Sequence, residues 1–142
     1  MNVPTDPQLK RLYELSKRQL SDLIFFDEEM KFLKNLLEKY FLSKIKDSRI
    51  NRVQLISRQL SQLRMVQSNI TRDALMHQGN LNSKIKELLG KSIDFLIIEN
   101  ERVGEEISDL TRCFKNIKKD IFSVYKDLEA EELLKTKFQN HT

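Results

Sequence analysis

The chain has 142 residues, of which 32% are charged and 39% hydrophobic, with only three glycines, two prolines and one cysteine. Its net charge of +4 is mild, its length indicates one domain spanning residues 1–142, and its lone cysteine excludes an internal disulfide. Because turns between strands need glycine and proline, the composition favours long helices in a reducing compartment.

Neither export nor membrane insertion is indicated by the sequence. The first residues, MNVPTDPQLKRLYELSKR, have no apolar stretch behind a basic start, so they lack the pattern of a signal peptide. The most apolar segment near the middle, FLIIEN, is far too short to cross a bilayer. We therefore expect a cytoplasmic protein without a membrane span.

The first helix is expected over about residues 6–46. Thr5 or Asp6 can cap its N-terminus, and Pro7 fits the first helical position, where a missing N–H costs nothing. Helical spacing predicts that Phe41 shares one face with a buried stripe, which consists of Leu9, Leu12, Ser16, Gln19, Leu23, Phe26, Met30, Leu33, Leu37 and Tyr40.

The second helix is expected over about residues 48–89, with Asp47 or Ser48 as its cap and Gly90 just past its end. Its stripe consists of Val53, Ile56, Leu60, Leu63, Gln67, Ile70, Ala74, His77, Leu81, Lys84 and Leu88. An alternative break near Gly79 and Asn80 stays open, since a glycine inside a helix costs about 1 kcal/mol relative to alanine.

The third helix is expected over about residues 92–138, with Ser92 as its cap. Its stripe consists of Ile93, Leu96, Asn100, Val103, Ile107, Leu110, Phe114, Ile117, Ile121, Val124 and Leu128. Asn100 either lies in the core, where it would fix the register, or is hydrated near the end of the bundle. His77 is interpreted as a partly buried packing residue.

Three helices of similar length joined by short links must run antiparallel to their neighbours. The spacing of the stripes, alternating three and four, is typical of coiled-coil-like packing. The sequence therefore predicts an all-α fold, an elongated antiparallel three-helix bundle.

The first helix has an unusually wide apolar face. Phe25, Phe32 and Leu36 form a second arc beside its buried stripe. One interpretation is that this arc contacts both neighbouring helices; the other is that it stays exposed and binds a partner. Phe122 and Tyr125 on the third helix form a second candidate contact surface.

The residues required for known catalytic and cofactor sites are not found at suitable spacings. The two histidines, His77 and His141, are not preceded at three residues by glutamate, so the di-iron carboxylate motif is missing. Cys113 has no histidine nearby to activate it, and no glycine-rich phosphate loop occurs. We therefore expect no enzyme activity, no cofactor, no metal and no small-molecule substrate.

An arginine-rich segment without acids lies near the start of the second helix. Its arginines are Arg49, Arg52, Arg58, Arg64 and Arg72. They could bind nucleic acid, but they scatter around the helix instead of following one face. The other interpretation is that they are solvated or pair with acids of the third helix, such as Glu105 or Asp109.

The segment SDLIFFDEEMKFLKNLLEKYF, residues 21–41, resembles a segment found in small all-helical bacterial proteins with no activity attached to them. The resemblance implies a bacterial cytosolic protein and carries over no functional residue. From the residues we expect a non-catalytic structural or interaction module that self-associates, as a homo-oligomer, or docks a partner helix. The alternative is a nucleic-acid-binding helical protein that uses the arginine-rich segment.

Overall fold

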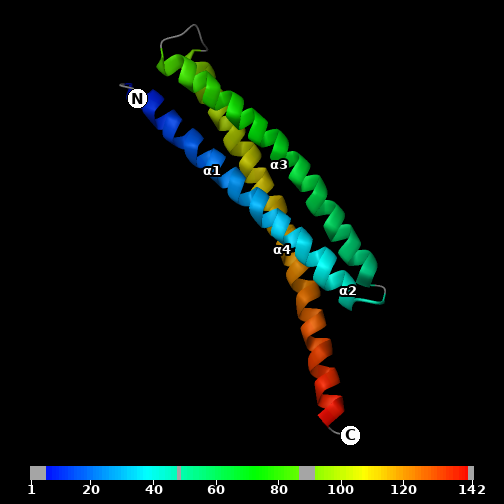
Figure 1. Cartoon of the computed structure of the whole chain (residues 1–142). Helices are drawn as coiled ribbons and strands as arrows, with labels where there is room; N and C mark the ends of the chain where they lie inside the picture. Colours follow the sequence, from blue (N-terminus) through cyan, green and yellow to red (C-terminus); the bar gives the residue numbers. More distant parts are fainter. Residues whose placement is uncertain (1–5, 48, 87–91, 141–142) are drawn as a thin grey trace.

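The computed structural model describes residues 6–47, 49–86 and 92–140, with residues 135–140 by backbone alone, and it forms a three-helix bundle (Figure 1). The elements in chain order are α1 (Pro7–Leu36), the π-helical turn η1 (Leu37–Phe41), the short α2 (Leu42–Lys44), α3 (Arg49–Ile85) and α4 (Ile93–Asn140).

The all-α antiparallel three-helix bundle expected from the sequence is confirmed. α3 packs along both α1 and α4, whereas α1 and α4 contact each other less extensively. The C-terminal part of α4 continues well beyond α2 (Figure 1). The bundle is therefore most open between α1 and α4.

Side-chain caps start the helices where the sequence indicated them. The Asp6 carboxylate accepts hydrogen bonds from the backbone N–H groups of Gln8 and Leu9, at 2.8 and 3.1 Å. Asp47 accepts one from Arg49 N at 2.9 Å, and the Ser92 hydroxyl accepts one from Phe95 N at 3.2 Å. Each cap satisfies backbone donors that have no partner inside the helix.

α3 runs without a break through Gly79. A Cβ added at Gly79 would meet nothing within 4 Å, so close packing does not require a glycine at this position. The other expected break, at Gly90, lies outside the described residues.

The core follows the expected stripes closely along α3, and it departs from them at η1. The residues of α3 that are buried are Val53, Ile56, Leu60, Leu63, Gln67, Ile70, Ala74, His77 and Leu81. In η1 the chain makes a π turn, which fits one more residue into a turn than an α-helix does. Phe41 consequently takes the fully buried position, while Tyr40, expected in the stripe, is 37% exposed.

A buried polar layer divides the apolar core into two clusters. The smaller cluster contains Leu9, Leu12, Leu81 and Leu96, and the larger one begins at Leu23, Ala74 and Val103. Between them lie the buried polar side chains Ser16, His77, Glu99 and Asn100. Asn100 is thus in the core, and His77, expected to be partly buried, is completely buried.

His77 lies at the centre of this layer. Its Nδ1 is 2.6 Å from Glu99 Oε1, and its Nε2 is 3.1 Å from the Asn100 amide nitrogen. With Asn100 donating to Nε2, the ring proton sits on Nδ1 and is donated to the carboxylate. The Asn80 amide donates to both Glu99 oxygens at 3.1 Å. Because these bonds need one alignment of α3 and α4, the layer favours a single register.

Candidate interaction surface

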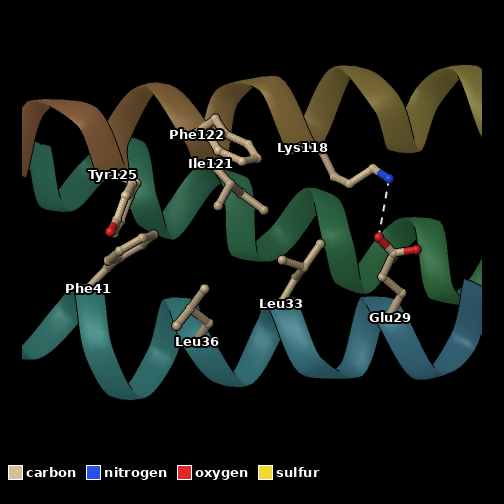
Figure 2. A pocket seen from close by; sticks show the side chains of 8 residues that line it. All are labelled: Glu29, Leu33, Leu36, Phe41, Lys118, Ile121, Phe122 and Tyr125. Carbon is tan, nitrogen blue, oxygen red and sulfur yellow. Dashed lines mark hydrogen bonds and ion pairs between the residues drawn. The ribbon is translucent and has the colours of Figure 1, made fainter.

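A groove of about 310 Å³ lies where α1 and η1 face α4 (Figure 2). Its lining residues are Glu29, Leu33, Leu36, Phe41, Lys118, Ile121, Phe122 and Tyr125. Six of these eight carry apolar or aromatic side chains, so the groove is mostly apolar. α3 runs behind it in this view.

The side chains of the groove differ in how much they remain exposed. Phe41 and Ile121 are buried and belong to the main core. Phe122 is 63% exposed and Tyr125 is 40% exposed, so apolar area remains open to water. An ion pair between Lys118 Nζ and Glu29 Oε1, 3.2 Å long, joins the two helices at one end of the groove (Figure 2).

The groove joins residues that the sequence had placed in two separate candidate surfaces. Leu36, which belongs to the second apolar arc of the first helix, lines the groove together with Phe122 and Tyr125. Phe25 and Phe32 do not line the groove, and they are 62% and 65% exposed. At about 100° per residue, both lie within about 40° of Leu36 around α1. They therefore extend the apolar face of α1 beyond the groove.

Leu33, Phe41 and Ile121 were not expected to contribute to the surface, because each was assigned to the buried side of its helix. The groove runs between two helices, so its floor comes from core residues. Helical spacing gives the faces of α1 and α4 but not how far apart these helices lie. The pairing of Lys118 with Glu29 could not be predicted from the sequence, because it too depends on how α1 and α4 lie relative to each other.

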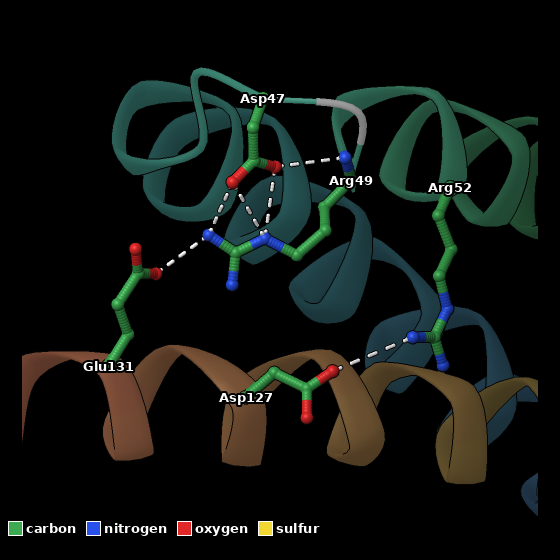
Figure 3. Close-up of polar contacts among 5 residues, drawn as sticks. All are labelled: Asp47, Arg49, Arg52, Asp127 and Glu131. Atoms are coloured by element: carbon green, nitrogen blue, oxygen red, sulfur yellow. Dashed lines mark hydrogen bonds and ion pairs between the residues drawn. The ribbon is translucent and has the colours of Figure 1, made fainter.

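Ion pairs hold α4 against the start of α3 (Figure 3). The Arg49 guanidinium is 2.8 Å from Asp47 and 2.7 Å from Glu131. Arg52 is 3.7 Å from Asp127. The hydrogen bonds that Arg49 donates to Asp47, and then to Glu131, raise the pKa of Arg49, and Arg49 in turn lowers the pKa of the Asp47 carboxyl.

A second set of polar contacts surrounds the aromatic end of the groove. The Lys44 ammonium lies 3.0 Å from both the Tyr40 hydroxyl and Glu132 Oε1. The hydrogen bond to Tyr40, followed by the one to Glu132, raises the pKa of Lys44. The Tyr125 hydroxyl donates to Glu129 Oε1 at 3.1 Å, and this bond raises the pKa of Tyr125.

The arginine-rich segment does not converge on one exposed surface. Besides the contacts of Arg49 and Arg52, Arg64 is 3.5 Å from Asp27 of α1, and Arg72 donates to Asn69 at 2.7 Å. Arg58 is exposed.

Arg49 and Arg52 pair with acids of the third helix, as one interpretation of the sequence had it, but the acids given as examples, Glu105 or Asp109, were wrong. The antiparallel register brings the start of α3 to Asp127 and Glu131 instead. Further along α3, Asp73 lies close to Glu106. Burial, and then the charge of Asp73, raises the pKa of Glu106. This part of α4 therefore meets an acid and not the arginines.

Within residues 6–47, 49–86 and 92–140, no three or more His, Cys, Asp and Glu side chains are grouped so that they could hold a metal ion. Cys113 is exposed. In that same part of the chain, no helix combines the length and apolar character needed to cross a membrane.

Comparisons with protein families, with curated proteins and with solved structures gave no match to this chain.

Proposed function

We propose that this protein is a non-catalytic interaction module that binds an amphipathic helix, its own or a partner's, in the groove between α1 and α4. The observation that supports the proposal is the exposure of Phe122, 63%, beside an apolar groove between two helices. A helix laid into this groove would complete a four-helix arrangement, the usual way in which bundles bury such a face.

The expected energetics fit a modest interface built around aromatic anchors. Burying a phenylalanine side chain is worth about 1.5–3 kcal/mol, and aromatic residues are common binding hot spots. Phe122 and Tyr125 are suited to this role, with Leu36 opposite them on α1. Association also costs several kcal/mol of lost motional freedom, so the flanking surface must contribute as well.

The proposal predicts a contact at Phe122 in living cells. A photo-crosslinking phenylalanine analogue at position 122 should capture a protein, and the mass of the adduct shows whether it is a second copy or another chain. The matched control carries the same analogue at Met65 of α3, which is 70% exposed and lies outside the groove. Equal crosslinking at both positions, or none at 122, contradicts the proposal.

The alternative, nucleic-acid binding by the arginine-rich segment, receives less support. Arg49, Arg52 and Arg64 already face carboxylates of α1, α4 or the preceding turn. Phosphate contacts would have to displace these pairs. The lone exposed Cys113 accords with a reducing, cytoplasmic setting for either function.

A further inference from the structure

We propose that the helix received by the groove is α4 of a second copy, running antiparallel, so that the chain forms a two-fold symmetric dimer. This inference rests on the proposed function and specifies its partner. It is based on the order of charges and aromatics along the face of α4 that borders the groove.

One face of α4 carries two lysines, then two aromatics, then two glutamates. Their spacing alternates three and four, which places them along a single stripe of the helix. The stripe consists of Lys115, Lys118, Phe122, Tyr125, Glu129 and Glu132. Lys118, Phe122 and Tyr125 also line the groove. Lys115, Glu129 and Glu132 are exposed.

Turned end for end, this stripe is complementary to itself. When Phe122 is set against Tyr125 of the second copy, equal spacing sets Lys118 against Glu129 and Lys115 against Glu132. By two-fold symmetry every pair occurs twice, giving four ion pairs around two aromatic contacts. A parallel arrangement would instead set lysine against lysine and glutamate against glutamate, which is unfavourable.

The same register accounts for exposed apolar residues outside the stripe. In this register, Leu133 of the second copy lies at the same height along the helix axis as Phe114. The Phe114 ring contacts Phe26 of α1 edge-on, with a centroid distance of 5.7 Å. Phe25 is adjacent to Phe26 on α1, and Phe25 and Leu133 are 62% and 60% exposed. The second α4 would therefore cover the apolar face of α1 as well as the groove.

The contacts within one chain do not oppose this arrangement strongly. Lys118 pairs with Glu29, and Glu132 pairs with Lys44, but these groups are partly exposed. Such surface pairs contribute little to stability and can be exchanged for pairs with a second copy. Glu129 and Glu132, the acidic half of the stripe, are exposed, so another copy can reach them.

Charge reversal tests the register. Variant A carries Lys115→Glu and Lys118→Glu, and variant B carries Glu129→Lys and Glu132→Lys. Each variant alone turns all four pairs repulsive. At about 0.2–0.5 kcal/mol per pair for attraction and a similar amount for repulsion, its dimer dissociation constant should rise roughly 10- to 1,000-fold. Light scattering after size exclusion should then show a dimer for the wild type and monomers for A and B.

Mixing A with B makes every pair complementary again. The mixture should therefore form a heterodimer with close to wild-type affinity, a result that misfolding of either variant cannot produce. Circular dichroism and the melting temperature of each variant check its fold. The antiparallel register is overturned if the wild type is monomeric, if A and B remain dimeric, or if the mixture stays monomeric.

Disulfide trapping gives an independent readout that does not depend on charge. In a Cys113→Ser background, a mixture of Lys118→Cys and Glu129→Cys chains should give the 118–129 disulfide and little of the 118–118 disulfide. In the antiparallel pair the two copies of residue 118 lie about 16 Å apart along the axis, too far to bridge. A dominant 118–118 disulfide refutes the inference but leaves helix docking intact. A monomeric wild type that crosslinks to another protein through position 122 also refutes the antiparallel dimer and leaves helix docking intact.

Discussion

The buried pair of His77 and Glu99 makes a quantitative prediction about stability. Substituting His77→Leu removes the partner at the shortest distance from a carboxylate that is only 8% exposed, and among the described residues it leaves the hydrogen bonds from Asn80. Removing one member of a buried ion pair or charge-assisted hydrogen bond costs about 3–5 kcal/mol. We expect His77→Leu to lower the free energy of unfolding by about that amount, measured by urea denaturation.

The companion variants separate the pair from simple packing. Glu99→Leu should cost less, about 1–3 kcal/mol, because it leaves the imidazole N–H unsatisfied but no buried charge. The double variant His77→Leu with Glu99→Leu should be more stable than His77→Leu alone, since apolar replacement of a buried pair is often neutral or stabilising. Strict additivity of the two single effects, or a cost of His77→Leu below about 1 kcal/mol, would show that the two side chains are not coupled.

Three further substitutions probe other parts of the bundle. Gly79→Ala should stabilise the protein by about 0.5–1 kcal/mol, seen as a higher melting temperature, because the added methyl meets open space in a continuous helix. Phe41→Ala should cost about 3–5 kcal/mol in urea denaturation, because the ring is fully buried. Glu106→Gln should raise the melting temperature at neutral pH, because burial and then Asp73 raise the pKa of Glu106 and so disfavour its ionised form in the folded state. This gain should shrink as the pH falls through that raised pKa, where the wild-type carboxyl becomes protonated. Glu105→Gln, which neutralises an exposed neighbouring carboxylate, is the matched control.

Two outcomes would contradict this reasoning. Tyr40→Ala, the matched control for Phe41→Ala, should cost much less because Tyr40 is 37% exposed. Equal costs would mean that the π turn does not set which of the two rings is buried. Destabilisation by Gly79→Ala would mean that α3 needs flexibility at this glycine.

The sequence predicted best the features that depend on one helix at a time. The stripe from Val53 to Leu81 was predictable because its spacing continues without a break and each position is on the same face. Tyr40 was misplaced because a π turn changes the spacing locally, and no residue type marks such a turn. Asn100 was correctly placed on the stripe, but the sequence left open whether it is buried.

Features that depend on the alignment of two helices could not be read from periodicity. Glu99 lies one residue from the stripe of α4, and only the register of α3 against α4 brings it to His77. The pairing of Arg49 with Glu131 depends on the same register. Likewise the groove arises because α1 and α4 separate where Leu36 faces Phe122, a spacing that neither helix encodes alone.

The division of the core into two clusters has a consequence for hydrogen exchange. The smaller cluster, with Leu9, Leu12, Leu81 and Leu96, is linked to the rest of the core across a layer that contributes little apolar burial. Opening this end of the bundle therefore requires less free energy than global unfolding. Amide protons near Leu12 and Leu81 should exchange with solvent sooner than those near Leu60 and Leu110, so the molecule opens from the end where α1 begins.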